Sequence, residues 1–142
     1  MSHELTELSF TVSGRVSRPI AEVFEAVADP AQLSKYFTTG GARGRLEAGA
    51  AVTWDFHDFP GRFPIEVIEA DPPRRILIRW DGNAAADEDG KTTTTFEFEP
   101  IDNGDRTLVT ITEASWRPTA EGATSAFGNC MGWSGMLAAL EM

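Results

Sequence analysis

The feature of this sequence that most constrains its fold is a series of five segments between residues 51 and 116 in which apolar and polar residues alternate. Alternation with a period of two puts the apolar side chains on one face of a β-strand. Turn-forming residues separate the segments, and Asn103-Gly104 is a strong hairpin signal. The segments are 51–58, 62–70, 75–80, 91–99 and 106–116. Together they predict an antiparallel meander.

The part of the chain before the meander is expected to add one or two strands and two short helices. Residues 8–16 alternate strictly and predict a strand. Pro19 opens the first helix, whose apolar residues recur at helical spacing. Asp29-Pro30 ends it and begins the second, because Asp suits the N-cap and Pro the first helical position. A glycine-rich loop follows, with one short strand expected at residues 43–47.

The chain is expected to end in a long helix over residues 119–142. At 100° per residue, one side carries Ala126, Cys130, Trp133, Leu137 and Leu140. The opposite side carries Gly128, Gly132, Gly135 and Ala139. Small residues at this spacing let another backbone approach closely, so a homodimer through this side and a bare exposed side both remain open. Met131 and Met136, which flank it, favour a contact because they would add exposed apolar surface.

Length and composition bound the class of protein. The 142 residues fit a single domain spanning 1–142. The net charge of −10 disfavours nucleic-acid binding, for which a basic surface supplies most of the affinity. The single cysteine can form neither an internal disulfide nor a cysteine-rich zinc site, which suits the cytoplasm. No apolar run approaches the ~20 residues needed to span a bilayer, and the N-terminus lacks the pattern of a signal peptide.

The order of elements is a strand, two helices, a meander and a long helix, and it predicts an α+β fold. Three local patterns make the sequence resemble the START-like (SRPBCC, helix-grip) superfamily. They are VSRPIAEVFEAVADPAQLSKYF at 16–37, RFPIEVIEADPPRRILIRW at 62–80 and GWSGMLAAL at 132–140. The branch that they resemble most is the one related to the C-terminal domain of the activator of Hsp90 ATPase. That branch often has a tryptophan where this second helix ends in Tyr36-Phe37, and its last helix commonly continues past the position of Met142, which leaves a truncated end open.

The resemblance implies a helix-grip fold, with an antiparallel sheet of six to seven strands wrapped on the C-terminal helix and an apolar ligand cavity between them. The residues aimed at that cavity would be Trp54, Phe56, Phe63, Ile65, Ile78, Trp80, Phe96, Phe98, Cys130 and Trp133. The alternative is that these side chains fill the space completely and form an ordinary core. Buried tryptophan N–H groups need hydrogen-bond partners, and Thr92, Thr94 and Thr110 are expected to supply them.

The residues that could act as catalysts or metal ligands are more simply explained as ordinary surface or core residues. His57 lies on the face of its strand opposite Trp54, so it is expected to point away from the cavity, without the further ligands that a metal site needs. Cys130 lacks a nearby base and is expected to be an inert core residue. Four glutamates, Glu66, Glu97, Glu99 and Glu113, are expected on the solvated face of the sheet. No catalytic residue, metal or cofactor is therefore predicted.

Three functions remain open. The first is a non-catalytic, cytoplasmic protein that binds a small apolar ligand of lipid, acyl or aromatic type. The second is a protein that contacts a chaperone, as the name of the resembling branch suggests. The third is a cyclase-like enzyme that uses the same cavity. A titratable group inside the cavity would favour the third over the first, because proton transfer needs such a group next to the substrate.

Overall fold

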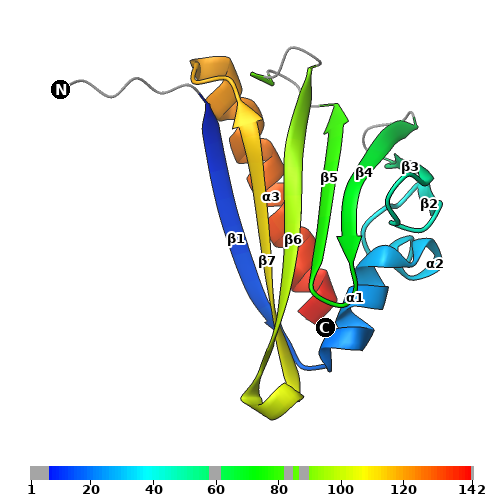
Figure 1. Ribbon diagram of the computed structural model, residues 1–142. Helices are drawn as coiled ribbons and strands as arrows, with labels where there is room; N and C mark the ends of the chain where they lie inside the picture. Colours follow the sequence, from blue (N-terminus) through cyan, green and yellow to red (C-terminus); the bar gives the residue numbers. More distant parts are fainter. Residues whose placement is uncertain (1–6, 58–61, 82–84, 87–89, 142) are drawn as a thin grey trace.

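The computed structural model describes residues 7–57, 62–81, 85–86 and 90–141. Over these residues, seven strands form one antiparallel sheet in the order β1-β7-β6-β5-β4-β3-β2 (Figure 1). The strands are β1 Leu8–Val16, β2 Gly41–Arg43, β3 Ala51–Asp55, β4 Phe63–Asp71, β5 Arg75–Asp81, β6 Lys91–Ile101 and β7 Arg106–Trp116. The strands β3 to β7 are sequential neighbours, so the predicted meander and the α+β helix-grip fold are confirmed.

The short strand expected at residues 43–47 is placed wrongly by the sequence. The structure puts β2 at Gly41–Arg43, where it pairs with β3. Leu46 is instead fully buried, and its backbone N–H donates to the carbonyl of Ala28, so this part of the chain packs on α1 rather than into the sheet. Residue 58 at the end of the predicted strand 51–58 and residues 59–61 after it lie outside the described residues. So do residues 82–84 and 87–89, between the predicted strands 75–80 and 91–99.

The two short helices are α1, Ile20–Ala28, and α2, Pro30–Leu33. Asp29 separates them and caps α2: its Oδ1 accepts from the backbone N–H of Ala31 at 3.0 Å, and its Oδ2 accepts from Gln32 Nε2 at 3.1 Å. These bonds lower the pKa of Asp29 below its ordinary value of 3.8. Asp29 itself is extended between the two helices, and after α2 the ring of Phe37 lies against Trp54 of β3.

The long helix α3 extends over Ala120–Glu141 and packs along β1 and β7. The helix approaches β1 closely at Gly14. A Cβ atom added to this glycine would lie 3.5 Å from Cβ of Leu137 on α3. The inward side carries Ala126, Trp133, Leu137 and Leu140, as predicted. Two assignments are wrong: Met136 is buried rather than exposed, and Cys130 is only partly buried at the edge of the contact.

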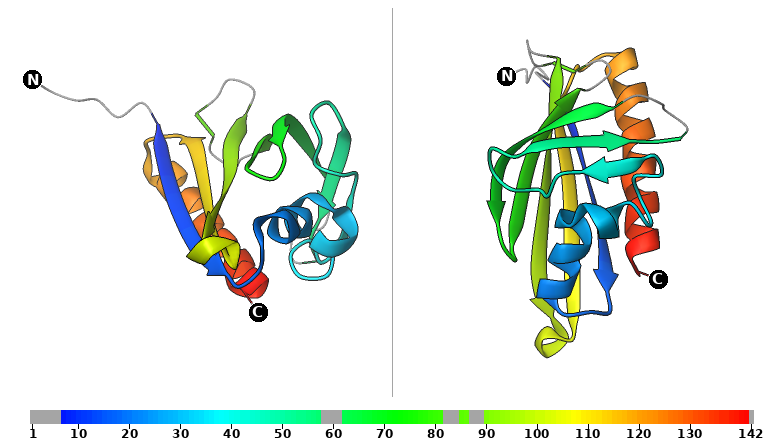
Figure 2. Two further views of the ribbon diagram at one scale, coloured as in Figure 1. Left: turned by 60° about the horizontal axis from the view of Figure 1, so that its bottom comes forward. Right: turned by 90° about the vertical axis from the view of Figure 1, so that its right-hand side faces the viewer.

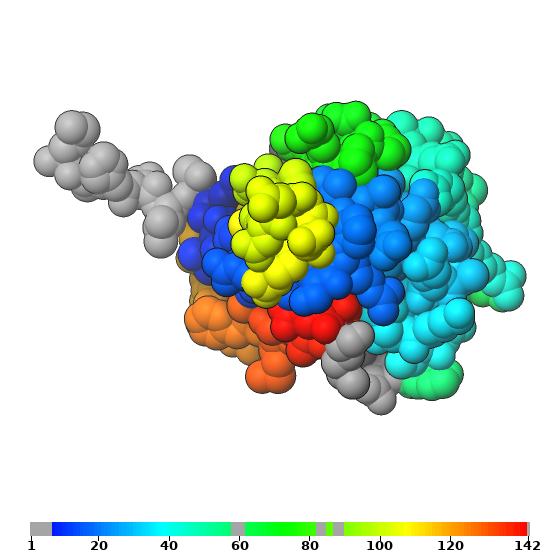
Figure 3. Space-filling view, turned by 90° about the horizontal axis from the view of Figure 1, so that it is seen from below, coloured from blue at the N-terminus to red at the C-terminus, as the bar shows by residue number. Residues whose placement is uncertain are grey.

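The sheet twists strongly, which decides where the helices can cover it. Figure 2 shows β2 and β3 running across the direction of β6 and β7, with α3 on one side of this fold and α1 and α2 closing it below. The space-filling view in Figure 3 shows the β6–β7 turn beside α1 and the C-terminal end of α3. The interior lies between the curved sheet, α3 and the α1–α2 unit.

Candidate functional site

A cluster of aromatic rings occupies the interior between α3, the strands β3 to β6 and the end of α2. Neighbouring ring centroids lie 5.2–6.3 Å apart, and most pairs are edge-to-face or tilted. Such arrangements stabilise beyond area burial. We call this the aromatic cluster; it consists of Phe37, Trp54, Phe56, Phe63, Trp80, Phe96 and Trp133.

The aromatic cluster has a closed side and an open side. Three of its rings, Trp54, Phe96 and Trp133, are buried. The other four, Phe37, Phe56, Phe63 and Trp80, are partly exposed to solvent. A protein core usually grades from buried to exposed through aliphatic and polar groups, whereas here large rings themselves reach the surface.

Phe37 follows α2, and the residue before it is fixed by a hydrogen bond to α1. Tyr36, its neighbour, donates its hydroxyl to the carbonyl of Ala26 at 2.8 Å. Burial raises the pKa of Tyr36 above its ordinary value of 10.0, so the hydroxyl stays a donor. This bond holds the end of α2 on α1 and directs Phe37 onto Trp133, on which its ring stacks at 5.2 Å.

A buried carboxylate lies next to the aromatic cluster. Glu113, on β7, is 0% exposed. Its Oε1 accepts from Trp133 Nε1 at 2.8 Å and from Asn129 Nδ2 at 3.0 Å. Its Oε2 accepts from Thr92 Oγ1 at 2.5 Å and from Trp80 Nε1 at 3.0 Å. The carboxylate thus joins α3 to three neighbouring strands.

The prediction that Glu113 lies on the solvated face of the sheet is wrong, although Glu66, Glu97 and Glu99 are exposed as expected. Glu113 has the same parity in β7 as the buried Val109 and Ile111. The alternation of β7 therefore points it inward. Its charge had suggested the outer face, but the parity signal in the sequence was sufficient to find it.

The four donors to Glu113 match the capacity of an ionised carboxylate, which offers about four lone-pair sites. The two indole N–H groups can only donate, and one of them is bonded to each oxygen. All four partners are neutral, and the described residues include no Lys, Arg or His paired with Glu113. The carboxylate is held in place, and no lone pair is left over for a proton acceptor role.

Several buried side-chain polar atoms have no hydrogen-bond partner among the protein atoms, and two of them are Trp54 Nε1 and Thr94 Oγ1. The prediction that threonines would satisfy the tryptophans is therefore wrong: Thr92 donates to Glu113, Thr94 has no partner, and Thr110 lies on the other face of the sheet. An unsatisfied buried polar group costs about 1–3 kcal/mol, and in native proteins it calls for an explanation. Here both groups lie beside the aromatic cluster.

The remaining residues predicted to face the cavity are dispersed. Ile65 and Ile78 are buried in the hydrophobic core. Phe98 is buried too, but it packs against Phe24 of α1, with ring centroids 5.3 Å apart. Cys130 lies partly exposed on α3. The structure thus brings six of the ten predicted residues into the aromatic cluster, and sequence reasoning missed Phe37, Asn129 and Glu113.

His57 is exposed, and its backbone N–H donates to Thr39 Oγ1 at 2.9 Å. Over the described part of the chain, no three His, Cys, Asp or Glu side chains come close enough together to hold a metal ion.

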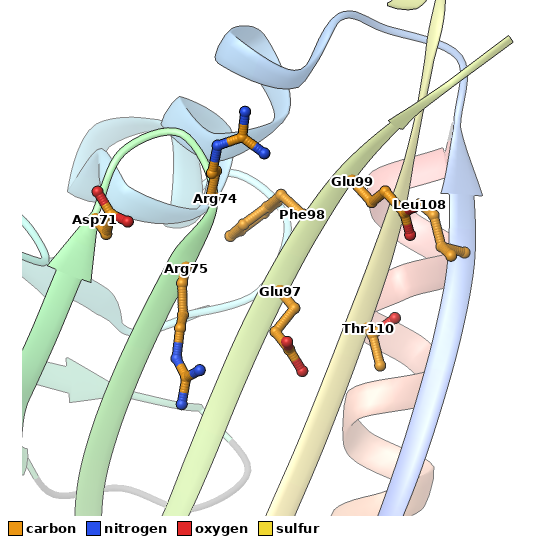
Figure 4. A pocket seen from close by; sticks show the side chains of 8 residues that line it. All are labelled: Asp71, Arg74, Arg75, Glu97, Phe98, Glu99, Leu108 and Thr110. Carbon is orange, nitrogen blue, oxygen red and sulfur yellow. The ribbon is translucent and has the colours of Figure 1, made fainter.

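A hollow on the outer face of the sheet, with a volume of about 460 Å³, has a different chemistry. Figure 4 shows its charged side chains, which come from the end of β4, the β4–β5 turn, the start of β5 and from β6. One of them, Arg75, pairs with Glu69 at 3.3 Å. The lining residues are Asp71, Arg74, Arg75, Glu97, Phe98, Glu99, Leu108 and Thr110. This charged, open surface does not suit the apolar ligand that the sequence suggests.

A model of a known protein family matches most of the chain. Residues 17–142 match the family model described as activator of Hsp90 ATPase homolog 1-like protein. No curated protein sequence matches the chain. No helix among the described residues is both long and apolar enough to cross a membrane.

Three solved structures are similar over most of the chain. Protein MLL2253 from Mesorhizobium loti is 19% identical with a TM-score of 0.77, and 94% of each chain is covered. DynU16, from the dynemicin biosynthetic locus, is 26% identical with a TM-score of 0.73, over 94% of this chain but only 45% of that one. The Aha1 dimer from Colwellia psychrerythraea is 18% identical with a TM-score of 0.73, over 95% and 97%.

Proposed function

The chain belongs to the activator of Hsp90 ATPase homolog 1-like protein family, and on that premise we propose that it binds a small, mostly apolar molecule without transforming it. The ligand site is the open side of the aromatic cluster, formed by Phe37, Phe56, Phe63 and Trp80. The ligand class is an aromatic or acyl compound. The single cysteine of the chain is consistent with a reducing compartment such as the cytoplasm.

The observation that carries this proposal is that large rings from several elements meet around buried polar groups and reach solvent on one side. Ligand sites are mostly apolar and aromatic, with a few placed polar groups that set orientation. Trp54 Nε1 and Thr94 Oγ1, which have no partner in the protein, are groups of that kind. A ligand oxygen that reached Trp54 Nε1 would remove the cost of leaving this donor unsatisfied.

A non-catalytic role is supported by the way in which Glu113 is held. A general base must accept a proton from its substrate within hydrogen-bond reach. Glu113 already accepts four hydrogen bonds from the protein, and abstracting a proton would require breaking at least one of them. A cyclase-like reaction would have to overcome this, whereas ligand binding leaves the carboxylate network intact.

The test is a titration of the protein with a panel of apolar compounds, such as naphthalene derivatives and medium-chain acyl esters, followed by tryptophan emission. We expect saturable binding at micromolar concentrations, since few polar contacts are available. Trp80→Ala should weaken the affinity at least about tenfold. The matched control is Ile68→Ala, because Ile68 is exposed on β4.

A second variant fills the proposed site with a larger side chain instead of deleting a side chain that lines it. Ile78→Trp adds volume next to the aromatic cluster, and binding at the proposed site should be lost. Saturable binding that survives this change would place the site elsewhere. If neither this panel nor a charged aromatic compound binds, the aromatic cluster is simply a core and the proposal is wrong.

We also propose that two copies associate through the outer side of α3. Phe127 and Met131 are 73% and 77% exposed there. Between Glu121 and Glu141 the helix has no charged residue, although the chain carries −10. A two-fold interface sets a patch against itself, so an uncharged patch avoids like-charge repulsion. No described atom lies within 4 Å of a Cβ added at Gly128, Gly132 or Gly135, which leaves room for the protruding side chains of a second copy.

Sedimentation of the parent protein should therefore give a dimer, as the name of the Colwellia psychrerythraea structure states for that relative. Gly132→Glu should convert the dimer to a monomer, because it puts a charge against its own copy. Ser13→Glu, on the outer face of β1, adds the same charge elsewhere and should leave the dimer intact. A parent that is monomeric at high concentration rules out this contact.

A further inference from the structure

The buried carboxylate next to the aromatic cluster has no positive partner, and we propose that the ligand supplies it: the molecule bound here carries a cationic nitrogen on an apolar body. This inference rests on the proposed function and names the charge of the ligand. It adds a charge to the small apolar ligand of lipid, acyl or aromatic type that the sequence alone suggests.

The first step of the argument is electrostatic. Glu113 is 0% exposed, and the groups that hold it are two indoles, a hydroxyl and an amide, all neutral. Neutral donors satisfy the hydrogen-bonding capacity of a carboxylate but leave its net charge in place. Buried charges in proteins are usually paired with an opposite charge or a metal. Over the described residues, no such pairing is present for Glu113.

The second step concerns the rings. Trp54, Trp80 and Trp133 are in mutual contact, with centroids 5.4–6.3 Å apart. Tryptophan is the side chain whose face attracts a cation most strongly, and groups of such rings recognise quaternary ammonium ions. Two of these tryptophans donate to Glu113. The carboxylate polarises their N–H groups, which pushes electron density toward the ring faces and favours a cation there.

The third step is access. Trp80 and Asn129 each donate to Glu113 and are each partly exposed to solvent. A ligand that lies over Trp80 at the open side of the aromatic cluster is therefore one side chain away from the carboxylate. At such a distance in a partly desolvated site, the attraction between opposite charges is several times stronger than in water. The same field repels an anion such as a fatty-acid carboxylate.

The experiment compares three probes that share a benzyl group and differ in charge: benzyltrimethylammonium, benzyl alcohol and phenylacetate. Each is titrated into the protein and followed by tryptophan emission and by the indole N–H resonances of Trp80 and Trp133. We expect the cation to bind at least about tenfold more tightly than the alcohol, and phenylacetate to bind most weakly. Benzyltrimethylammonium has no N–H, so its preference reports charge rather than a hydrogen bond.

The variants separate the local charge from the −10 of the whole chain. Glu113→Gln should remove the preference for the cation over the alcohol. Glu97→Gln removes one charge from the exposed face of β6 and should keep the preference. A folded Glu113→Gln protein that still prefers the cation overturns the proposal. If this variant does not fold, the three probes are compared on the parent protein at high salt, which screens the exposed charges far more than a buried one. Loss of the preference for the cation under these conditions overturns the proposal.

The outcomes distinguish this inference from the function on which it rests. Equal binding of the cation and the alcohol, or binding of neutral apolar compounds alone, overturns the cationic ligand and leaves the ligand-binding function standing. Failure of all three probes and of the neutral panel overturns both. Binding of the cation with the expected ranking, loss of that ranking in Glu113→Gln and its retention in Glu97→Gln support the proposal.

Discussion

The two ends of the interior lie under the same sheet but have different chemistry. At the end near the β6–β7 turn, α1 covers β6 and β7, and its contacts are hydrocarbon: Phe24 packs on Phe98, next to buried Val27 and Val109. At the other end, α3 covers the aromatic cluster and the carboxylate of Glu113. One end has the features of a core, whereas the other combines a core with a polar network and partly exposed rings.

The two ends therefore differ in the kind of contact that holds them: hydrocarbon packing at one end and a polar network at the other. A hydrocarbon contact is non-directional and tolerates substitution of similar volume. A buried carboxylate with four donors is directional, and removing one partner leaves the others imperfectly satisfied. We therefore expect substitutions in the two ends to differ in size and in kind.

The largest effect is expected for Trp133→Ala, which removes ring contacts and one donor to Glu113 together. The free energy of unfolding should fall by about 5 kcal/mol, at the upper end for loss of a large core side chain. Leu137→Ala, on the same side of α3, should cost about 3 kcal/mol. Urea denaturation followed by circular dichroism measures both. A larger loss for Leu137→Ala would contradict the stronger coupling of the aromatic end.

The next effect concerns the carboxylate itself. Glu113→Gln turns one acceptor into an N–H₂ group that must face an indole N–H, so the free energy of unfolding should fall by about 1–3 kcal/mol. The neighbouring inward residue of β7 provides the comparison, since Ile111→Val should cost only about 0.5–1.5 kcal/mol. Equal costs in thermal melts would mean that the polar network adds nothing to packing.

A smaller effect is expected for Trp80→Phe, which keeps a ring but deletes the N–H that reaches Glu113 Oε2. Three donors to the carboxylate remain, and Trp80 is partly exposed, so the loss should be about 1 kcal/mol. The indole resonance of Trp133 should shift, because its acceptor carboxylate becomes less satisfied. An unchanged resonance would indicate that the two tryptophans are not coupled through Glu113.

The smallest effect lies outside both ends, at the surface pair of Glu25 on α1 and Arg45. Arg45 Nη2 donates to Glu25 Oε1 at 2.9 Å. This bond lowers the pKa of Glu25 below its ordinary value of 4.5. The pair should stabilise the folded protein above pH 4.5 and lose its contribution as the pH falls through the lowered pKa. Because both side chains are more than one-third exposed, the contribution should stay below about 1 kcal/mol.

The test is the stability of Glu25→Gln at several pH values. Its deficit relative to the parent should be constant above pH 5 and should vanish in strong acid. A deficit that grows as the pH falls has the wrong sign for this pair.

Local patterns were enough to predict most of the fold. The strand β1 begins and ends where alternation predicts, and so does β7. The cap at Asp29 forms as its spacing indicates, because its partners Ala31 and Gln32 are within one helical turn. Such features depend on residues that are close in sequence, so the interactions that decide them can be read directly. The misplaced strand β2 is different, since its position depends on pairing with β3 across a glycine-rich loop.

The polar centre of the site could be only partly anticipated. Parity along β7 was sufficient to turn Glu113 inward. Its donors, however, come from residues 80, 92, 129 and 133, and no periodicity relates them to residue 113. The pairing of Trp80 with Thr92 across β5 and β6, and of Thr94 with Glu113 across β6 and β7, brings the strand donors to the carboxylate. The packing of α3 brings the other two. The sequence by itself thus determined which strand residues face inward, because side-chain direction in a strand follows from the period of two. Only the tertiary structure decided which inward residues meet, because that depends on strand register and helix packing over long sequence separations.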